Sequence, residues 1–450
     1  MTTLILGGGA TGLAAAYIAA TAPGRAGRDV TVVEGSPKLG GLLSTFETAG
    51  DRLEYFYHHF FTHDREINWL LARLGITSEV LFKPTVMGVF RDGAIYDFTT
   101  PVDLLRFKPL SLVDKLRFGA SSLLLSRYPD WRKHEDESAL AWFERWAGPG
   151  ATAAIWKPML DIKFGKYGAD VPVAWMSGRL RQRLNSREKG RESLGYLLGS
   201  LERLVERLEE ELRRLGVRFV LGRKAKSIAV EGGRVTSLEL EDGERVACDE
   251  LLATVPAPVL ANLLPADRGA YAEELRRIKY FGAICVVLTM KKPLSHVYWL
   301  NVADPGFPFG GIIEHTNFVP PARYGGHHLA YLSRYIDLAD PLATEDTAAI
   351  GERWIGELPR IYPNFRREDV IKVQTFRTHG AATVVHRNYS RVVPQCRTPI
   401  GGLFVSTMAH IYPDERSVNN CIRIAANACR VMGIQHEVPD GVSLSGQVGF

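Results

Sequence analysis

The chain is 450 residues long, which exceeds one ordinary core and predicts two domains, or three. Its 46% hydrophobic and 23% charged residues are typical of a soluble globular protein. The net charge of +5 is small for this length. It argues against a protein that binds nucleic acid over much of its surface, and it permits a local basic pocket for an acidic ligand.

The first predicted elements form a nucleotide-binding turn. "TLILGGGATGLAAAYIAA" indicates a short buried strand from Leu4 to Leu6, a glycine turn and an alanine-rich helix. The G-x-G-x-x-G spacing allows a tight turn, lets a pyrophosphate approach the backbone, and lets the helix pack closely on the strand. The helix N-terminus then faces the phosphates. The residues expected to contact the nucleotide here are Gly7, Gly9, Ala10, Thr11 and Gly12.

The next strand, "DVTVVEG", ends on an acidic residue. Glu34 lies 22 residues beyond Gly12, where a carboxylate can accept hydrogen bonds from ribose hydroxyls. An ordinary βαβ unit with a surface glutamate is the alternative. A second glycine pair, Gly40-Gly41, follows within "EGSPKLGGLLST", and a nicotinamide dehydrogenase would not need this pair.

The strand, acid and second glycine pair resemble the extended fingerprint of the superfamily of FAD enzymes that contains amine oxidases, protoporphyrinogen oxidases and phytoene desaturases. The resemblance implies an α/β fold with a Rossmann-like FAD-binding domain of the glutathione reductase type. Leu42 stands where this superfamily usually has a basic residue. Cys396 is too close to the C-terminal flavin segment to match the covalent cysteine of monoamine oxidases, so non-covalent FAD is expected.

Two later segments extend the resemblance. Residues 216–260 alternate apolar and polar residues over short strands joined by "EGGR" and "EDGE" turns. In the superfamily the first of these strands gives a backbone contact to adenine, which would fall near Ala225. "GGLFVSTMAHIYPDERSVNNCIRIAANACRVM" predicts a strand, a turn and a helix, and implies contacts with the ribityl chain and flavin ring from Met408, Arg416 and Val418.

These segments predict a discontinuous FAD-binding domain with an inserted α+β substrate domain. The FAD-binding domain is expected at 1–48, 190–270 and 365–436, the substrate domain at 49–189 and 271–364, and a loosely held tail at 437–450. "SLGYLLGSLERLVERLEEELRRLG", residues 193–216, has leucines at helical spacing with charges on the other face, and predicts one amphipathic helix.

Three histidines occur in "YFYHHFFTHD", residues 55–64. His59 and His63 have i, i+4 spacing, but the Glu of H-E-x-x-H is absent and no further ligand cluster is near, so no metal site is expected. The segment is similar to the P-H-x-F-H-T segment of UDP-galactopyranose mutase, with His59 at the histidine beside the flavin. We therefore expect His59 to face the flavin as a catalytic residue, His58 to point elsewhere, and His63 to mark a solvent-facing helix start. Ordinary core histidines are the alternative.

A dense basic and aromatic segment, "WKPMLDIKFGKYGADVPVAWMSGRLRQR", spans residues 156–183. Arg179 and Arg183 share a helix face, which suits a bound phosphate or carboxylate, and Trp175 can stack on a base or sugar. Its W-x-P-x-L-x-x-K-F-G pattern, which includes Lys163, resembles bacterial protoporphyrinogen oxidase-like proteins. The alternative is a solvated basic helix. The predicted substrate-binding residues are Lys163, Trp175, Arg179, Arg183 and Asn317.

Asn317 belongs to "GGIIEHTNF", in which a polar run follows an apolar strand. Its Glu314 and His315 are further catalytic candidates.

Residues 103–128 are basic and amphipathic. Two helices packed on the substrate domain are favoured for them over a membrane-docking surface.

The expected function is therefore that of an FAD-dependent oxidoreductase that transfers a hydride between a substrate C–H and flavin N5. The basic helix and the mutase-like histidines favour a small-molecule substrate that is a phosphorylated, nucleotide-linked or lipid-linked sugar, and no nucleic-acid partner. The alternatives are a mutase that uses reduced FAD, a tetrapyrrole or polyene oxidase, and a flavin-binding protein without turnover.

Cysteine usage and the N-terminus bear on location. The five cysteines form no C-x-x-C pair, and their odd number fits no closed disulfide set, which predicts reduced thiols. The N-terminus lacks a basic region and is broken by glycines, so no signal peptide is expected. No apolar run reaches the ~18 residues of a membrane span. A cytoplasmic protein with at most peripheral membrane contact is expected.

Overall fold

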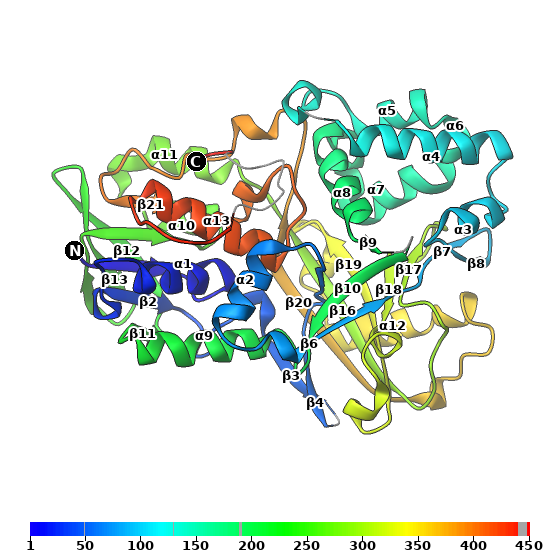
Figure 1. The fold of residues 1–450 in the computed structure, drawn as a ribbon, viewed down its shortest axis with the longest axis horizontal. Coiled ribbons are helices and arrows are strands. Elements are labelled where there is room, and N and C mark those ends of the chain that lie inside the picture. Colours follow the sequence, from blue (N-terminus) through cyan, green and yellow to red (C-terminus); the bar gives the residue numbers. More distant parts are fainter. Residues whose placement is uncertain (49, 129, 189–190, 440–447) are drawn as a thin grey trace.

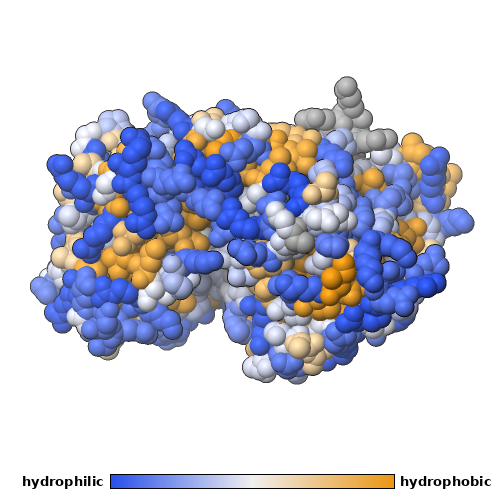
Figure 2. Space-filling model, turned by 90° about the horizontal axis from the view of Figure 1, so that it is seen from below, coloured by the Kyte–Doolittle hydropathy of each residue, from blue (hydrophilic) through white to orange (hydrophobic). Residues whose placement is uncertain are grey.

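The computed structural model describes residues 1–48, 50–128, 130–188, 191–439 and 448–450. The protein has two halves, with the N-terminus in one and the largest antiparallel sheet in the other (Figure 1). Viewed from below, hydrophilic residues predominate on the surface and a notch separates two lobes (Figure 2).

The first half is built on a parallel sheet of five strands in the order β11-β2-β1-β15-β21. The strands are β1 (Thr3–Leu6), β2 (Val30–Glu34), β11 (Arg218–Leu221), β15 (Glu250–Ala253) and β21 (Leu403–Val405). A three-stranded sheet adjoins it, formed by β12 (Ala225–Glu231), β13 (Arg234–Leu240) and β14 (Arg245–Ala247). The helices of this half are α1 (Ala10–Thr21), α2 (Arg65–Arg73), α9 (Glu202–Arg214), α10 (Ala257–Leu263), α11 (Gly269–Arg276) and α13 (Val418–Val431).

Both faces of the parallel sheet are covered, which explains why its strands are mostly apolar, with charged residues at strand ends. In β1, Ile5 joins the cluster formed with α1, α9 and α13, whereas Leu4 and Leu6 join the cluster that contains β12 and β13. Successive side chains of a strand point to opposite faces, so β1 contributes to both layers. The predicted Rossmann-like α/β fold is confirmed.

The second half is built on a seven-stranded sheet in the order β20-β16-β19-β18-β17-β7-β8, antiparallel except for the pair β17 and β7. Its strands are β7 (Met87–Arg91), β8 (Ala94–Asp97), β16 (Tyr280–Met290), β17 (Trp299–Val302), β18 (Gly311–Glu314), β19 (His328–Ile336) and β20 (Val370–Thr383). The helices of this half are α3 (Pro101–Arg106), α4 (Leu112–Ser126), α5 (Ala139–Trp146), α6 (Pro149–Ala151), α7 (Lys157–Phe164), α8 (Val173–Asn185) and α12 (Thr347–Ile355).

Two smaller sheets lie where the halves meet. One pairs β5 (Phe60–Phe61), β10 (Arg191–Leu197) and β6 (Val80–Pro84), with β9 (Arg187–Glu188) beside β10, and the other pairs β3 (Thr45–Thr48) with β4 (Asp51–Glu54). The chain passes between the halves repeatedly, after α2, before α9, before β16 and after β20.

The predicted domain boundaries stay predictions. Strand β20 falls in a range assigned to the FAD-binding domain, and it pairs with β16 of the seven-stranded sheet. The boundaries at residues 49 and 189–190, and residues 440–447 of the predicted tail, lie outside the described residues.

The single helix predicted over residues 193–216 is wrong in its first part. Residues 193–197 belong to β10, which is paired on one side with β5 and on the other with β6. Positive φ angles at Gly199 and Ser200, +86° and +73°, separate this strand from α9. Leu204, Leu208 and Leu212 of α9 are buried, as the helical pattern predicts.

Candidate functional site

The glycine turn after β1 is closed on one side and open on the other. A Cβ atom at Gly12 would lie 1.8 Å from the carbonyl oxygen of Gly7, so only glycine allows α1 to approach the strand this closely. A Cβ atom at Gly9 would meet no atom of the described chain within 4 Å. The N-terminus of α1 therefore faces open space, as a phosphate-binding turn requires.

The acid and the second glycine pair lie against this turn. The Glu34 carboxylate accepts hydrogen bonds from the amides of Gly8 and Ser36, each at 2.7 Å. The Gly40 amide donates to the Gly8 carbonyl at 2.9 Å, and Gly40 has a φ of +110° that favours glycine. The two glycine segments and the carboxylate thus form one continuous cradle.

Ala225, Val418 and Met408 lie in three further segments of the chain. The Gly222 amide donates a hydrogen bond to the Ser36 carbonyl oxygen at 2.8 Å. This contact places the start of β12, at Ala225, near the end of the cradle that contains Glu34. Helix α13 begins at Val418 and packs beside α1, where the Cys421 thiol is hydrogen-bonded with Thr11. Met408 starts the short helical turn that precedes α13.

An inner cavity of about 190 Å³ lies where the cradle meets the second half. Leu42, His58, His59 and Arg416 line one part of it, and α7, α8 and the seven-stranded sheet complete its wall. Four buried nitrogens around it, His58 Nδ1, His59 Nδ1, Trp156 Nε1 and Arg416 Nε, have no hydrogen-bond partner in the described part of the chain. Buried polar atoms are normally satisfied, so these nitrogens suit the polar atoms of a bound cofactor or substrate.

A buried charge cluster forms the opposite wall. The Glu415 carboxylate accepts hydrogen bonds from Lys163 on one oxygen and from Arg179 on the other. Burial opposes its ionisation, but Arg179 and Lys163 hold the pKa of Glu415 well below its ordinary value. Arg183 contacts Glu192 at 3.3 Å, and both Lys163 and Arg179 lie over the Trp175 ring.

The sequence of residues 10–432 matches the family described as flavin containing amine oxidoreductase. The chain belongs to this family. Membership confirms the predicted superfamily, the class of enzyme, an FAD-dependent oxidoreductase, and the cofactor, FAD. The cradle of the amine oxidoreductase fits FAD, because its glycine turn is open to a pyrophosphate and the inner cavity has unpartnered polar atoms at the ring end.

Solved structures share the fold of this amine oxidoreductase over nearly its whole length. A proposed protoporphyrinogen oxidase from Exiguobacterium sp. 255-15 has a TM-score of 0.75 at 20% identity, covering 96% of this chain and 98% of the other. Reduced UDP-galactopyranose mutase has a TM-score of 0.76 at 16% identity, covering 97% and 95%. The carotenoid phi-ring synthase of Chlorobaculum tepidum is 27% identical over 278 residues, which span 56% of this chain and 41% of that relative.

The structure brings together many of the residues that were singled out in the sequence. The glycines, Ala10, Thr11 and Glu34 form the cradle, Ala225 and Val418 begin elements that adjoin it, and Met408 lies in the turn before α13. The inner cavity is lined by Leu42, His59, Lys163, Trp175, Arg179, Arg183 and Arg416. Their roles toward FAD and substrate stay predictions.

Two expectations about histidines need correction. His58 does not point away from the cavity but lines it together with His59. Residues 55–59 lie outside the described strands, so the alternation of side chains in a strand does not apply to them. His63 lies outside the cavity and is partly buried, rather than fully exposed to solvent.

The run at Glu314, His315 and Asn317 does not reach the cavity. Glu314 accepts hydrogen bonds from the Leu294 amide and the Ser295 hydroxyl, and the His315 ring is hydrogen-bonded with Tyr324 at 2.7 Å. Asn317 donates to the carbonyls of Ser295 and Val297. All three side chains have structural partners, and their positions do not support the predicted catalytic and substrate-binding roles.

Glu415 was not among the predicted site residues. Its signal is weak, because "PDER" reads as an ordinary polar turn before a helix. Its partners Lys163 and Arg179 precede it by 252 and 236 residues, so no local pattern connects them.

Burial, together with the charge of Arg183, lowers the pKa of His59 to about 3, so its imidazole is neutral at pH 7. We expect His59→Ala to lower turnover by roughly 10²-fold and to shift the flavin absorbance or redox potential, because a neutral hydrogen-bonding ring is lost beside the cofactor. His63→Ala is the control and should change neither quantity. Equal, mild effects of both substitutions would assign these histidines to packing alone.

His315 predicts an acid-induced loss of stability. Burial lowers its pKa to about 3, so below its ordinary pKa of 6.5 the unfolded chain binds a proton that the folded protein excludes. Stability should fall as pH falls, by about 1.4 kcal/mol per pH unit for this residue. Denaturant titrations should show a shallower fall between pH 6.5 and 5 for His315→Gln. Tyr324→Phe retains the imidazole and should retain the slope, and an unchanged slope in His315→Gln would exclude this role.

Proposed function

We propose that this flavoenzyme oxidises a C–H bond of an anionic substrate, a phosphorylated, nucleotide-linked or lipid-linked sugar. The observation that supports it is the charge of the inner cavity. Lys163, Arg179, Arg183, Arg334 and Arg416 line it together with a single carboxylate, Glu415, among the described residues. Arg183 and Arg334 also contact carboxylates outside this lining, Glu192 and Asp340. Lys163, Arg179 and Arg416 face only Glu415 among the described lining carboxylates, and burying such an excess of positive charge is costly unless an anion offsets it.

The cations and aromatic rings have separable tasks. When bound, FAD would accept the hydride from the substrate. Arg183 and Lys163 bind the anionic group of the substrate, since guanidinium and ammonium groups form charge-assisted hydrogen bonds with phosphate. Trp175 offers a stacking face to a sugar or base. The neutral His59 ring orients the substrate or the flavin by hydrogen bonding.

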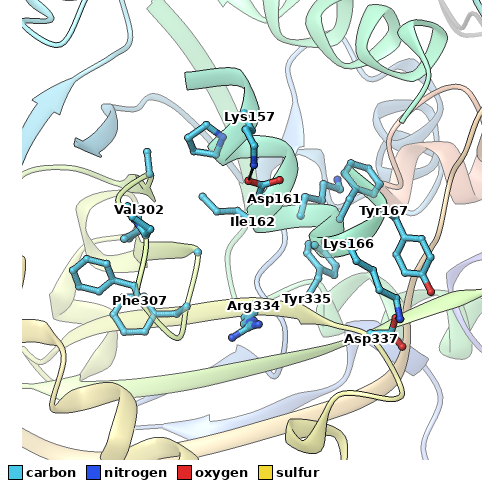
Figure 3. Close-up of a pocket in the computed structure, with 18 of the residues that line it drawn as sticks. Lys157, Asp161, Ile162, Lys166, Tyr167, Val302, Phe307, Arg334, Tyr335 and Asp337 are labelled. Atoms are coloured by element: carbon cyan, nitrogen blue, oxygen red, sulfur yellow. Dashed lines mark hydrogen bonds and ion pairs between the residues drawn. The ribbon is translucent and has the colours of Figure 1, made fainter. Parts of the chain in front are cut away.

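An outer cavity of about 730 Å³ gives room for the second part of such a substrate. It is formed by α7, the loop between β17 and β18 and the end of β19, and it shares Ile162, Lys163 and Tyr335 with the inner cavity. Figure 3 shows Ile162 extending from α7, with Phe307 on one side and Tyr335 on the other. Ile162 and Gly310 line both cavities, and a Cβ atom at Gly310 would lie 2.2 Å from Ile162 Cγ2, so this contact lies where the two cavities adjoin.

The test is anaerobic mixing of the oxidised holoenzyme with candidate substrates. Bleaching of the flavin absorbance by a sugar nucleotide or a polyprenyl-phosphate sugar, but not by the free sugar, is expected. Bleaching by a carotenoid or a protoporphyrinogen alone would overturn the anionic-sugar proposal.

A polyene oxidase is the second candidate. The curated relative named carotenoid phi-ring synthase and the aromatic wall of the inner cavity favour it, whereas the buried cations have no partner in a hydrocarbon. A mutase is favoured only by the histidine segment at His58 and His59, and it would convert a sugar nucleotide on reduced enzyme without net bleaching.

Arg183→Ala should raise KM by roughly 10- to 100-fold, because a hydrogen bond between charged groups contributes about 1.5–3 kcal/mol. The flavin spectrum should not change. Arg181→Ala is the matched control on the same helix, since Arg181 binds the carbonyl oxygens of Ser126 and Tyr128. Steady-state kinetics with the substrate that bleaches the flavin measures KM for both variants. An unchanged KM in Arg183→Ala would remove Arg183 from the substrate site.

A further inference from the structure

Helices α3 and α4 carry a concentrated apolar surface. Seven of the 13 exposed large hydrophobic residues in the described chain lie between Val102 and Leu124. On α4 they are Leu112, Val113, Leu116, Leu123 and Leu124, and they are 41–64% exposed. Their spacing places them on one side of the helix. Trp146, 47% exposed, lies nearby, because Arg117 of α4 contacts its carbonyl oxygen.

The opposite side of α4 already has a structural role. Ser121 and Leu125 are buried, and Ser177 of α8 donates a hydrogen bond to the Leu125 carbonyl. The predicted packing of these helices on the substrate domain is thus present. Leu125 is the one buried large apolar side chain of α4 and Phe118 is half-buried, whereas five large apolar side chains of this helix are exposed, so packing within the described chain leaves this side uncovered.

We propose that this α3–α4 surface docks on a membrane that contains anionic lipids. Exposed basic residues accompany the apolar side chains, with Arg106 at the end of α3, Lys108 just after it and Arg127 at the end of α4. The acidic residues of the segment, Asp103 and Asp114, are held in the N-terminal caps of the two helices. An apolar face flanked by basic side chains is the pattern of an interfacial helix on anionic lipid.

A second copy of the chain fits this surface less well. A two-fold contact would set each surface against itself and bring like charges together. Lipid headgroups instead supply the opposite charge, and acyl chains cover the leucines. No helix among the described residues is long and apolar enough to cross a membrane, so the contact is peripheral.

The surface also lies beside the outer cavity. Asp114 contacts Gly150 of α6, where a Cβ atom would lie 2.5 Å from its Oδ2 atom. Ala153 and Lys157, just after α6, line the outer cavity. A docked enzyme would therefore present this cavity close to the bilayer, which favours the lipid-linked member of the proposed substrate class. This last step rests on the proposed function, whereas docking itself does not.

Docking can be tested by sedimentation of the holoenzyme with phosphatidylcholine vesicles that contain or lack phosphatidylglycerol. Binding only to the anionic vesicles, weakened by salt, is expected. The variant Leu112→Ser/Val113→Ser/Leu116→Ser should lose it, and Arg106→Ala should weaken it about fivefold. The matched control, Val259→Ser/Leu338→Ser/Ile371→Ser, removes exposed apolar residues elsewhere and should bind normally.

Flavin absorbance reports whether each variant is folded, and turnover of a water-soluble substrate should be equal in all of them. No binding by the wild type, or equal loss in both triple variants, would overturn the proposal. A wild-type dimer that the leucine variant converts to a monomer would assign the surface to a second copy. Vesicle binding without turnover of any sugar substrate would retain docking and refute the proposed function instead.

Discussion

Gly12→Ala is expected to destabilise the protein by about 3 kcal/mol or more, with or without FAD. The added Cβ atom would lie 1.8 Å from the Gly7 carbonyl oxygen, a fixed backbone atom that cannot turn aside. Helix α1 would have to move away from β1, and both are central to the parallel sheet and its helical layer. Denaturant unfolding of the apoprotein measures this loss directly.

Gly9→Ala is the matched control. The alanine would meet nothing within 4 Å, and Gly9 has a φ of −80° that alanine adopts without strain. The apoprotein should keep its stability, but the methyl group would occupy the space that a pyrophosphate needs, and FAD affinity should fall at least roughly tenfold. Equal stability of the two apoproteins would show that α1 tolerates displacement. Unchanged FAD binding in Gly9→Ala would place the phosphates elsewhere.

Glu415→Gln is expected to destabilise the protein by about 3–5 kcal/mol, because it leaves Lys163 and Arg179 buried without their shared carboxylate. The substitution keeps the size of the side chain, so the loss reports charge rather than a cavity. Thermal unfolding in a buffer without multivalent anions measures it.

Anion rescue makes this variant informative about the site. Added inorganic phosphate should restore more stability to Glu415→Gln than to the wild type, since phosphate can replace the missing negative charge. The charge-preserving variant Glu415→Asp should need less rescue. Wild-type stability in Glu415→Gln without phosphate would mean that the cations are satisfied by solvent.

The glycine turn was predictable because its constraints are local. Gly7, Gly9 and Gly12 lie within six residues. The spacing alone expresses the tight turn at Gly7 and the close helix packing at Gly12, whereas the pyrophosphate contact of Gly9 stays a prediction. Glu34 was also identified from the sequence, and the ribose contact predicted for it stays a prediction; its carboxylate accepts hydrogen bonds from the amides of Gly8 and Ser36. Basic residues of α8 were also identified, since their i, i+4 spacing is a property of one helix.

Features that depend on distant pairing were missed. Residues 193–197 have helical spacing of leucines, but β5 and β6 offer this segment hydrogen bonds on both sides, and tertiary pairing overrides the local pattern. Glu314 and His315 were predicted to be catalytic because they are polar residues that follow an apolar strand. The sequence does not reveal their hydrogen-bond partners, Ser295 and Tyr324. Glu415 was missed because the two cations it joins precede it by more than half of the chain.

The repeated passage of the chain between the two halves has a mechanical consequence. One half of a protein can rotate against the other about a hinge when few chain segments connect the two halves. Here the connections after α2, before α9, before β16 and after β20 act as parallel tethers and oppose such rotation. Ligand exchange should therefore depend on side-chain rotation at the junction of Ile162 and Gly310, with rates that respond to the size of residue 162 and little to solvent viscosity.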